Sequence, residues 1–373
     1  MRANARPRLP TGSAGAPSPW TGASRGRTGS TLPWKAPMPR LPRLAGLATA
    51  TLALGLVAAA PPAAGRPAVP DARSAAHPTV AGSRIVAHFD LAKGQTPENI
   101  ALEPDGSADL TFAYAHQVAH VTLDGHTHRR ATLPTVTNPA TPVIGSAIAT
   151  GIARAHDGTL YVGYATGTRA TGIWRIAPGG GRPRQIAELP PNGLPNGLVL
   201  DERRHVLYAA DSALGMVWRI PQRGGTPTAW ARATALDPLP APPASGFGAN
   251  GIKLHGDAVW VSNTDRGTLL RIPVRDDGSA GRIETRATGL DGIDDFAFPG
   301  HGENVLAALN PSSRLALVRP DGSHTIVLTG DDGLSNPTSV AVRNWTVYVP
   351  SAAYFTQHDP NLLLASLHHW TRD

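Results

Sequence analysis

Short apolar runs of three residues recur along the chain at intervals of 42 to 52 residues, and most of them follow a tight turn rich in Asp and Gly. The runs lie at 110–112, 160–162, 207–209, 259–261, 305–307 and 347–349. A second turn and a further apolar strand follow four of them, at 172–176, 215–220, 267–272 and 314–318. Beyond the first 65 residues no segment shows a helical period.

Several short strands in each unit of about 45 residues are typical of a β-propeller blade. Six such units predict an all-β fold, a six-bladed β-propeller over residues 80–368. A seven-bladed ring is the main competitor, although no seventh repeat is visible. The strand at 84–89 precedes the first unit and has no partner within it. We expect it to pair with the last strand, at 361–367, because sharing a blade would close the ring and remove exposed edges.

The N-terminal region has a different composition from the repeats. Residues 1–37 are rich in Arg, Pro, Gly and Ser and read as a disordered upstream extension. Residues 38–68 then resemble a secretory signal peptide, with basic residues after Met38 and an apolar run at 44–60 that is shorter than a membrane span. We therefore expect a start at Met38, secretion, and no membrane contact after cleavage. An N-terminal membrane anchor is the alternative.

Removing this leader changes the charge of the chain. The formal net charge is +7, but residues 1–65 hold eight of the 34 basic residues and none of the 27 acidic ones. The remainder has 26 basic residues against 27 acidic ones, so it lacks the basic surface that a nucleic-acid partner requires. The absence of cysteine excludes thiolate metal sites, cysteine nucleophiles and disulfides.

One position of each innermost strand carries an oxygen-bearing side chain when the six units are aligned. This channel column consists of Glu98, Thr150, Asn196, Asn250, Asp294 and Thr338. Innermost strands line the channel of a propeller, so two carboxylates and two amides would converge there. Such a hard, oxygen-rich set suits a divalent metal, most of all Ca²⁺, and the lack of His and Cys disfavours zinc and copper.

A simpler interpretation competes with the metal site. Asn-Gly is a frequent hairpin turn signal, so Asn196 and Asn250 could be turn residues. Against this, each is followed at once by an inner-strand pattern, and each unit has its turn later. For Thr150 and Thr338, a place in the channel wall is favoured over metal ligation.

The segments 195–201 (PNGLVLD) and 207–212 (LYAADS) resemble the SMP-30/gluconolactonase/LRE-like family, a relative of paraoxonase and strictosidine synthase-like proteins. The resemblance covers residues 84–366 and implies a six-bladed, calcium-dependent propeller. It implies Glu98, Asn196, Asn250 and Asp294 as the metal ligands. Asp295 replaces the Gly that gluconolactonases usually show after the Asp, and it is a possible fifth contributor.

The resemblance further implies a hydrolase that opens a lactone or related ester through a metal-polarised carbonyl and an activated water. Asp294 would act as ligand and catalytic base. His116 or His120 is a candidate helper base, and the alternative is that each is a solvated histidine in a loop. For the substrate-binding wall we expect Asp211, Asn263, Thr150 and Tyr164, while Asp211 and Asn263 could instead cap turns.

Two functional classes remain open at this point. The first is the hydrolase, acting on a small-molecule substrate as a monomer. The second is a non-catalytic, small-ligand-binding propeller with a structural metal. A strictosidine synthase-like condensing role is a poorer third, because it needs a channel Glu that the sequence does not place.

Overall fold

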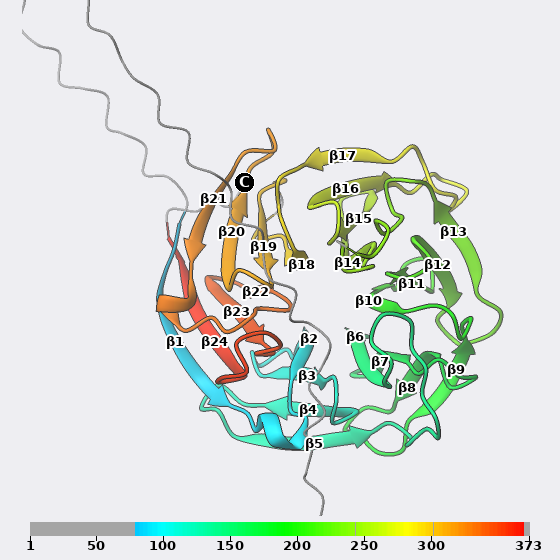
Figure 1. Cartoon of the computed structure of the whole chain (residues 1–373), viewed down its shortest axis with the longest axis horizontal. Coiled ribbons are helices and arrows are strands. Elements are labelled where there is room, and N and C mark those ends of the chain that lie inside the picture. Colours follow the sequence, from blue (N-terminus) through cyan, green and yellow to red (C-terminus); the bar gives the residue numbers. More distant parts are fainter. Residues whose placement is uncertain (1–78, 243, 301, 369–373) are drawn as a thin grey trace, which may run out of the picture. The chain divides into compact units, whose positions relative to one another are not determined.

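The computed structural model describes residues 79–242, 244–300 and 302–368. These residues form 24 strands and two short 3₁₀ helices, η1 (Leu91–Lys93) and η2 (Gly330–Asp332). The strands build six four-stranded antiparallel sheets, which surround a common centre as propeller blades (Figure 1). The predicted all-β, six-bladed propeller is confirmed. The predictions for residues 1–37 and 38–68 lie outside the described residues.

Each blade runs from an innermost strand at the channel to an outermost strand at the rim, and the first five blades follow the chain in order. Blades 1 and 2 consist of β2 (Pro97–Leu102), β3 (Ala108–Phe112), β4 (Gln117–Val121), β5 (Thr127–Thr132), β6 (Ile148–Arg154), β7 (Leu160–Ala165), β8 (Gly172–Ile176) and β9 (Arg184–Glu188). Blades 3 and 4 consist of β10 (Pro195–Asp201), β11 (Val206–Asp211), β12 (Met216–Pro221), β13 (Thr228–Arg232), β14 (Ala249–His255), β15 (Ala258–Asn263), β16 (Thr268–Pro273) and β17 (Glu284–Ala287). Blade 5 consists of β18 (Ile293–Ala297), β19 (Val305–Leu309), β20 (Arg314–Val318) and β21 (His324–Leu328).

Blade 6 joins the two ends of the described chain. Its inner strands are β22 (Ala341–Arg343), β23 (Thr346–Ser351) and β24 (Asn361–His368), and its outermost strand is β1 (Thr79–His88). β1 pairs antiparallel with β24, with Arg84 opposite Leu364. The predicted closure of the ring by the first and last strands is therefore confirmed.

Apolar packing between blades forms the core. Six clusters of buried side chains each draw on two neighbouring blades, and together they fill all six boundaries of the ring. Between blades 3 and 4, for example, Tyr208 and Ile252 are fully buried in one such cluster. Because strand side chains alternate between faces, both faces of each blade can bury apolar residues against a neighbour. A seventh cluster does not follow this pattern and is described below.

Candidate metal site in the channel

The channel column lies where the innermost strands depart from regular pairing. In five blades the pairing of the innermost strand with the next strand is interrupted at the column position. The interruptions fall between Pro97 and Asn99, Ala149 and Ile152, Pro195 and Leu198, Ala249 and Ile252, and Ile293 and Phe296. A β-bulge of this kind turns a side chain out of the ladder and redirects it. The column residues are thus released from the sheet toward the channel, where the innermost strands meet (Figure 1).

The glycines that follow three column residues allow the innermost strands to approach one another. A Cβ atom on Gly197 would lie 2.5 Å from the Asn250 carbonyl oxygen, and one on Gly251 would lie 2.4 Å from Asp295 Oδ1. Neither glycine has the positive φ of an Asn-Gly hairpin turn. The Asn-Gly pairs therefore belong to innermost strands, and the turn interpretation of Asn196 and Asn250 is wrong.

Hydroxyl groups hold the backbone immediately before all four expected metal ligands. In each case a hydroxyl from the preceding blade donates a hydrogen bond to the carbonyl of the residue before the ligand. The four bonds are Thr338 to Pro97 at 2.8 Å, Thr150 to Pro195 at 2.8 Å, Ser212 to Ala249 at 2.8 Å and Thr264 to Ile293 at 2.7 Å. These bonds link neighbouring blades around the channel and fix the starting point of each ligand side chain.

Two of these hydroxyls also orient the amides of the column. Asn196 Nδ2 donates to Ser212 Oγ at 3.3 Å, and Asn250 Nδ2 donates to Thr264 Oγ1 at 2.8 Å. Each hydroxyl has a single proton, which it gives to a backbone carbonyl, so it can only accept from the amide. The NH₂ group of each Asn must therefore face the hydroxyl, and the amide oxygen remains as a ligand atom for a cation.

Glu98 is buried and Asp294 is partly buried, and the charges of these two column carboxylates act on one another. Burial raises the pKa of Glu98 to about 7, against the opposing hydrogen bond from Tyr354, and the charge on Asp295 adds to the rise. Burial also raises the pKa of Asp294 well above its ordinary value, and the charges of Glu98 and Asp295 raise it further. Amide hydrogen bonds from Asn250 and Asn310 oppose that rise. A divalent cation bound between these two mutually repelling carboxylates would stabilise their ionised forms.

Each carboxylate has one oxygen engaged by a neighbouring side chain. The Tyr354 hydroxyl donates to Glu98 Oε2, and Asn310 Nδ2 donates to Asp294 Oδ2 at 3.0 Å. Such partners fix the orientation of ligating groups in metal sites. With the amide orientations above, the donor set of two carboxylates and two amide oxygens fits a hard divalent cation.

Asp295, considered above as a possible fifth contributor, forms an ion pair beside the column. Its side chain is 2% exposed, and its Oδ2 atom contacts Lys253 Nζ at 2.5 Å. Ser339 Oγ and Asn99 Nδ2 donate to the same oxygen at 2.6 and 3.1 Å. Asp295 thus forms a neutralised polar layer with Lys253 next to the column, and its charge acts on Glu98 and Asp294 through space.

We expected Asp211 and Asn263 to contact substrate, but both form hydrogen bonds with backbone groups. Asp211 is fully buried and accepts from two backbone N–H groups at 2.8 and 3.0 Å and from Trp218 Nε1 at 3.0 Å. Asn263 is also fully buried, donates to the carbonyls of Ala235 and Asp237, and accepts from the Arg266 N–H. Both have the turn-capping role that was the alternative interpretation.

Tyr164 and Thr150 are likewise part of the scaffold. Both residues are fully buried. Tyr164 donates its hydroxyl to the Pro134 carbonyl at 2.8 Å and packs edge-on against His116 at 5.5 Å between ring centroids. Thr150 makes the interblade bond to Pro195 described above. Neither residue forms the wall of a substrate site in this structure.

The polar residues that contact the column lie one position later than the predicted wall. Ser212 follows Asp211 and Thr264 follows Asn263, and Asn310 takes the equivalent place after Leu309, the last residue of β19. Successive strand residues point to opposite faces, so an alignment that is displaced by one residue selects side chains that do not face the column. Hydroxyl or amide side chains at this next position in three consecutive units are the sequence signal that could have found them.

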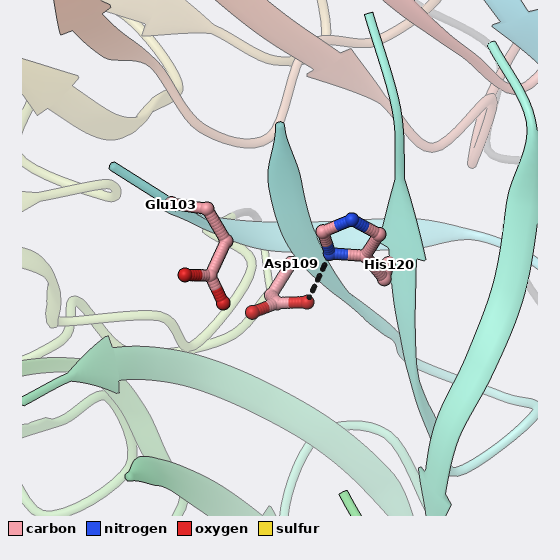
Figure 2. A group of neighbouring side chains, drawn as sticks. All are labelled: Glu103, Asp109 and His120. Atoms are coloured by element: carbon pink, nitrogen blue, oxygen red, sulfur yellow. Dashed lines mark hydrogen bonds and ion pairs between the residues drawn. The ribbon is translucent and has the colours of Figure 1, made fainter. Parts of the chain in front are cut away.

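The two histidines considered as helper bases each bond to another group. His116 Nε2 bonds to the Ala147 carbonyl at 2.8 Å and anchors a loop. His120 lies on β4, with Nδ1 at 3.1 Å from Asp109 Oδ1. Glu103, which follows the last residue of β2, lies beside this pair (Figure 2). Since Glu98 is near the start of β2, the two groups are about 15 Å apart along the strand.

The ligand atoms of Glu103, Asp109 and His120 all lie within 4.8 Å of one another, so this cluster could in principle hold a metal. Its carboxylates are already paired, however, since Arg130 contacts Glu103 at 2.8 Å and Asp109 at 2.7 Å. Arg154 contacts the other oxygen of Glu103 at 2.8 Å. A cation would have to displace these guanidinium groups, so we interpret the cluster as a buried ion-pair network that joins blades 1 and 2.

Solved structures share the fold of the chain. Regucalcin from Agrobacterium tumefaciens, described as a calcium-binding protein, is 15% identical and matches 77% of this chain and 94% of its own, with a TM-score of 0.56. A candidate gluconolactonase is 15% identical over 77% of this chain and 92% of its own, with a TM-score of 0.55. Virginiamycin B lyase from Staphylococcus aureus is 15% identical over 78% of this chain and 100% of its own, with a TM-score of 0.52.

No protein-family model matches the chain, and no curated protein matches it. The structural neighbours include propellers of the gluconolactonase type that the sequence resembles. At 15% identity this likeness shows the fold alone. One fold can host several chemistries, so function has to be argued from the site. Within the described part of the chain, no helix has the length and apolar character needed to cross a membrane.

Proposed function

We propose that this chain is a secreted, Ca²⁺-dependent hydrolase that opens a lactone or a related ester. The observation that carries the proposal is the orientation of four oxygen donors around the channel. Ser212 and Thr264 orient the amides of Asn196 and Asn250, while Glu98 and Asp294 supply two carboxylates whose charges act on one another. The calcium-binding description of one structural neighbour is consistent with this proposal.

Glu98, Asn196, Asn250 and Asp294 would hold the cation, with water and substrate supplying further oxygen ligands. When bound, Ca²⁺ would supply a Lewis acid for a substrate carbonyl. Asp294 would accept a proton from the attacking water and return it to the leaving alkoxide oxygen, so that water adds across the ester C–O bond. Asn310 holds the Asp294 carboxylate in position through a hydrogen bond at 3.0 Å.

A non-catalytic, ligand-binding propeller with a structural metal is the second candidate. It is favoured by the contacts of His116 and His120, which bond to a backbone carbonyl and to Asp109 respectively. A carboxylate that ligates a cation is a weakened base, because the cation favours its ionised form. The two candidates therefore differ in chemistry and share the metal site.

Elemental mass spectrometry of the purified protein tests the shared part. We expect one bound Ca²⁺ per chain, lost in both Asn250→Ala and Asp294→Ala and retained in the exposed-turn variant Asp321→Ala. A lactone and ester panel, with and without a chelator, then separates the candidates. Chelator-sensitive turnover supports the hydrolase, and bound Ca²⁺ without turnover of any substrate supports the binding propeller. Protein that takes up no Ca²⁺ would contradict both.

A further inference from the structure

The seventh apolar cluster lies at the end of the channel that carries the column. Its buried members are Ala113, Ile148, Ala165 and Leu194, and its partly exposed members are Ile144, Ala213, Phe247 and Tyr354. They come from blades 1, 2, 3, 4 and 6, at the starts of innermost strands, the ends of the strands beside them, or the adjoining loops. We call these eight residues the apolar collar. Unlike the six interblade clusters, the collar draws on five blades and leaves four of its members partly exposed.

The collar is continuous with the column. Tyr354 packs in the collar with its ring and donates its hydroxyl to Glu98 Oε2. Tyr114 extends the aromatic surface, since its ring meets that of Tyr354 edge-on at 5.9 Å and the residue is 45% exposed. A molecule with a polar end at the column carboxylates would thus place its other end against apolar side chains.

Strained backbone positions two of the partly exposed collar residues. Val143 has a φ of 68° and Ala353 a φ of 57°, a region that residues other than glycine rarely adopt. Each lies immediately before a collar residue, Ile144 and Tyr354 respectively. Strain of this kind persists only where surrounding contacts impose it, and it gathers at ligand-binding sites.

Two hydrogen bonds hold the backbone of the loop that follows Ala353. Asn336, which is 1% exposed, accepts hydrogen bonds from the backbone N–H groups of Phe355 and Thr356, both at 2.8 Å. The side-chain nitrogen of Asn336 donates to the Asn310 carbonyl at 3.1 Å. The loop that carries Tyr354 is therefore attached to the residue that holds Asp294.

We propose that the collar binds an apolar substituent of the substrate, so that the preferred substrates are lactones or esters with an aliphatic or aromatic group. This inference rests on the proposed hydrolase function and specifies its substrate class. A polyhydroxylated sugar lactone would lose water from its hydroxyl groups against Ile144, Phe247 and Ala213, whose side chains offer no hydrogen bonds in return. An alkyl or aryl group would gain from the same burial.

The first test compares γ-lactones with unbranched alkyl substituents of increasing length, together with glucono-δ-lactone. We expect kcat/KM to rise about fourfold for each added methylene until the collar is filled. Ile144→Ala and Phe247→Ala should reduce that slope, lowering kcat/KM for long-chain substrates about fivefold and leaving short-chain substrates nearly unchanged. Ile326→Ala makes the same change on exposed β21, far from the collar, and should have no effect.

The second test measures binding, so that failure of the collar can be told from failure of the hydrolase. γ-Lactams with the same alkyl groups resist hydrolysis, and their affinity for the Ca²⁺-supplemented protein can be measured by calorimetry. Affinity that rises with chain length, and less steeply in Ile144→Ala, supports the collar even if no lactone is hydrolysed. Turnover that is independent of chain length, or greatest for glucono-δ-lactone, would overturn the collar and leave the hydrolase standing. Lactams that do not bind, with no lactone hydrolysed, would overturn both.

Discussion

The side-chain nitrogen of Asn250 donates a hydrogen bond to the hydroxyl of Thr264 at 2.8 Å, and that hydroxyl in turn donates to the Ile293 carbonyl at 2.7 Å. One side chain of blade 4 therefore orients a ligand of its own blade and the backbone that precedes Asp294 in blade 5. Replacing Thr264 by valine keeps the shape and removes both bonds. We expect Thr264→Val to weaken Ca²⁺ binding about 10-fold to 100-fold, as measured by calorimetric titration.

Thr325→Val on the exposed strand β21 is the matched control for this change and should bind Ca²⁺ as the unmodified protein does. If Thr264→Val retains full affinity, the orientation of Asn250 does not depend on this relay.

The affinity for Ca²⁺ should depend on pH because protons compete for Glu98. Its pKa in the folded, metal-free protein is raised to about 7, so a cation must displace a proton below that pH. We expect the apparent affinity to rise as the pH is raised through about 7, with proton release on binding in the acidic range. Calorimetry in buffers of different ionisation enthalpy measures that release. An affinity that does not change between about pH 5.5 and pH 7.5 would contradict the assignment of Glu98 as a ligand.

The same raised pKa determines the sign of the stability change in the metal-free protein. Glu98 binds its proton more tightly in the folded state than in the unfolded state, where its pKa is near 4.5. Its contribution to the free energy of unfolding is therefore fully present below about pH 4.5 and is lost as the pH rises through about 7. Chemical denaturation of chelator-treated Glu98→Gln should lack this component of the pH dependence.

Gly197 is expected to tolerate no side chain. A Cβ atom there would lie 2.5 Å from the Asn250 carbonyl oxygen, so Gly197→Ala should push two innermost strands apart. We expect a loss of about 1–3 kcal/mol in the free energy of unfolding, together with weaker Ca²⁺ binding. Denaturant titration checks the first effect. Gly300→Ala, at a position where a Cβ would meet nothing within 4 Å, is the control and should be close to neutral.

Asp211 should matter for stability and have no direct part in turnover. Asp211→Ala would leave two backbone N–H groups and the Trp218 indole N–H without their buried acceptor. We expect the free energy of unfolding to fall by about 2–4 kcal/mol in a denaturant titration. KM for lactones should stay unchanged in the fraction that remains folded. A selective rise in KM at full stability would restore Asp211 as a residue that contacts substrate.

The repeat of strands and turns was sufficient to predict six blades and their closure by β1 and β24, because alternating apolar residues can be buried only when blades pack side by side. The same alignment picked out Glu98, Asn196, Asn250 and Asp294 as residues at one equivalent position of blades 1, 3, 4 and 5. Their equivalence is a property of the repeat, so it can be read from the sequence without any knowledge of contacts.

What surrounds these four residues was decided by tertiary structure. Bulges in the innermost strands set the direction of their side chains, and the phase of β11, β15 and β19 decides that Ser212, Thr264 and Asn310 face the column where Asp211, Asn263 and Leu309 do not. Tyr354 reaches Glu98 across 256 positions of the chain. The physical reason is that a repeat specifies which residues are equivalent, whereas hydrogen-bond partners depend on strand register and on the closure of the ring, which bring distant residues into contact.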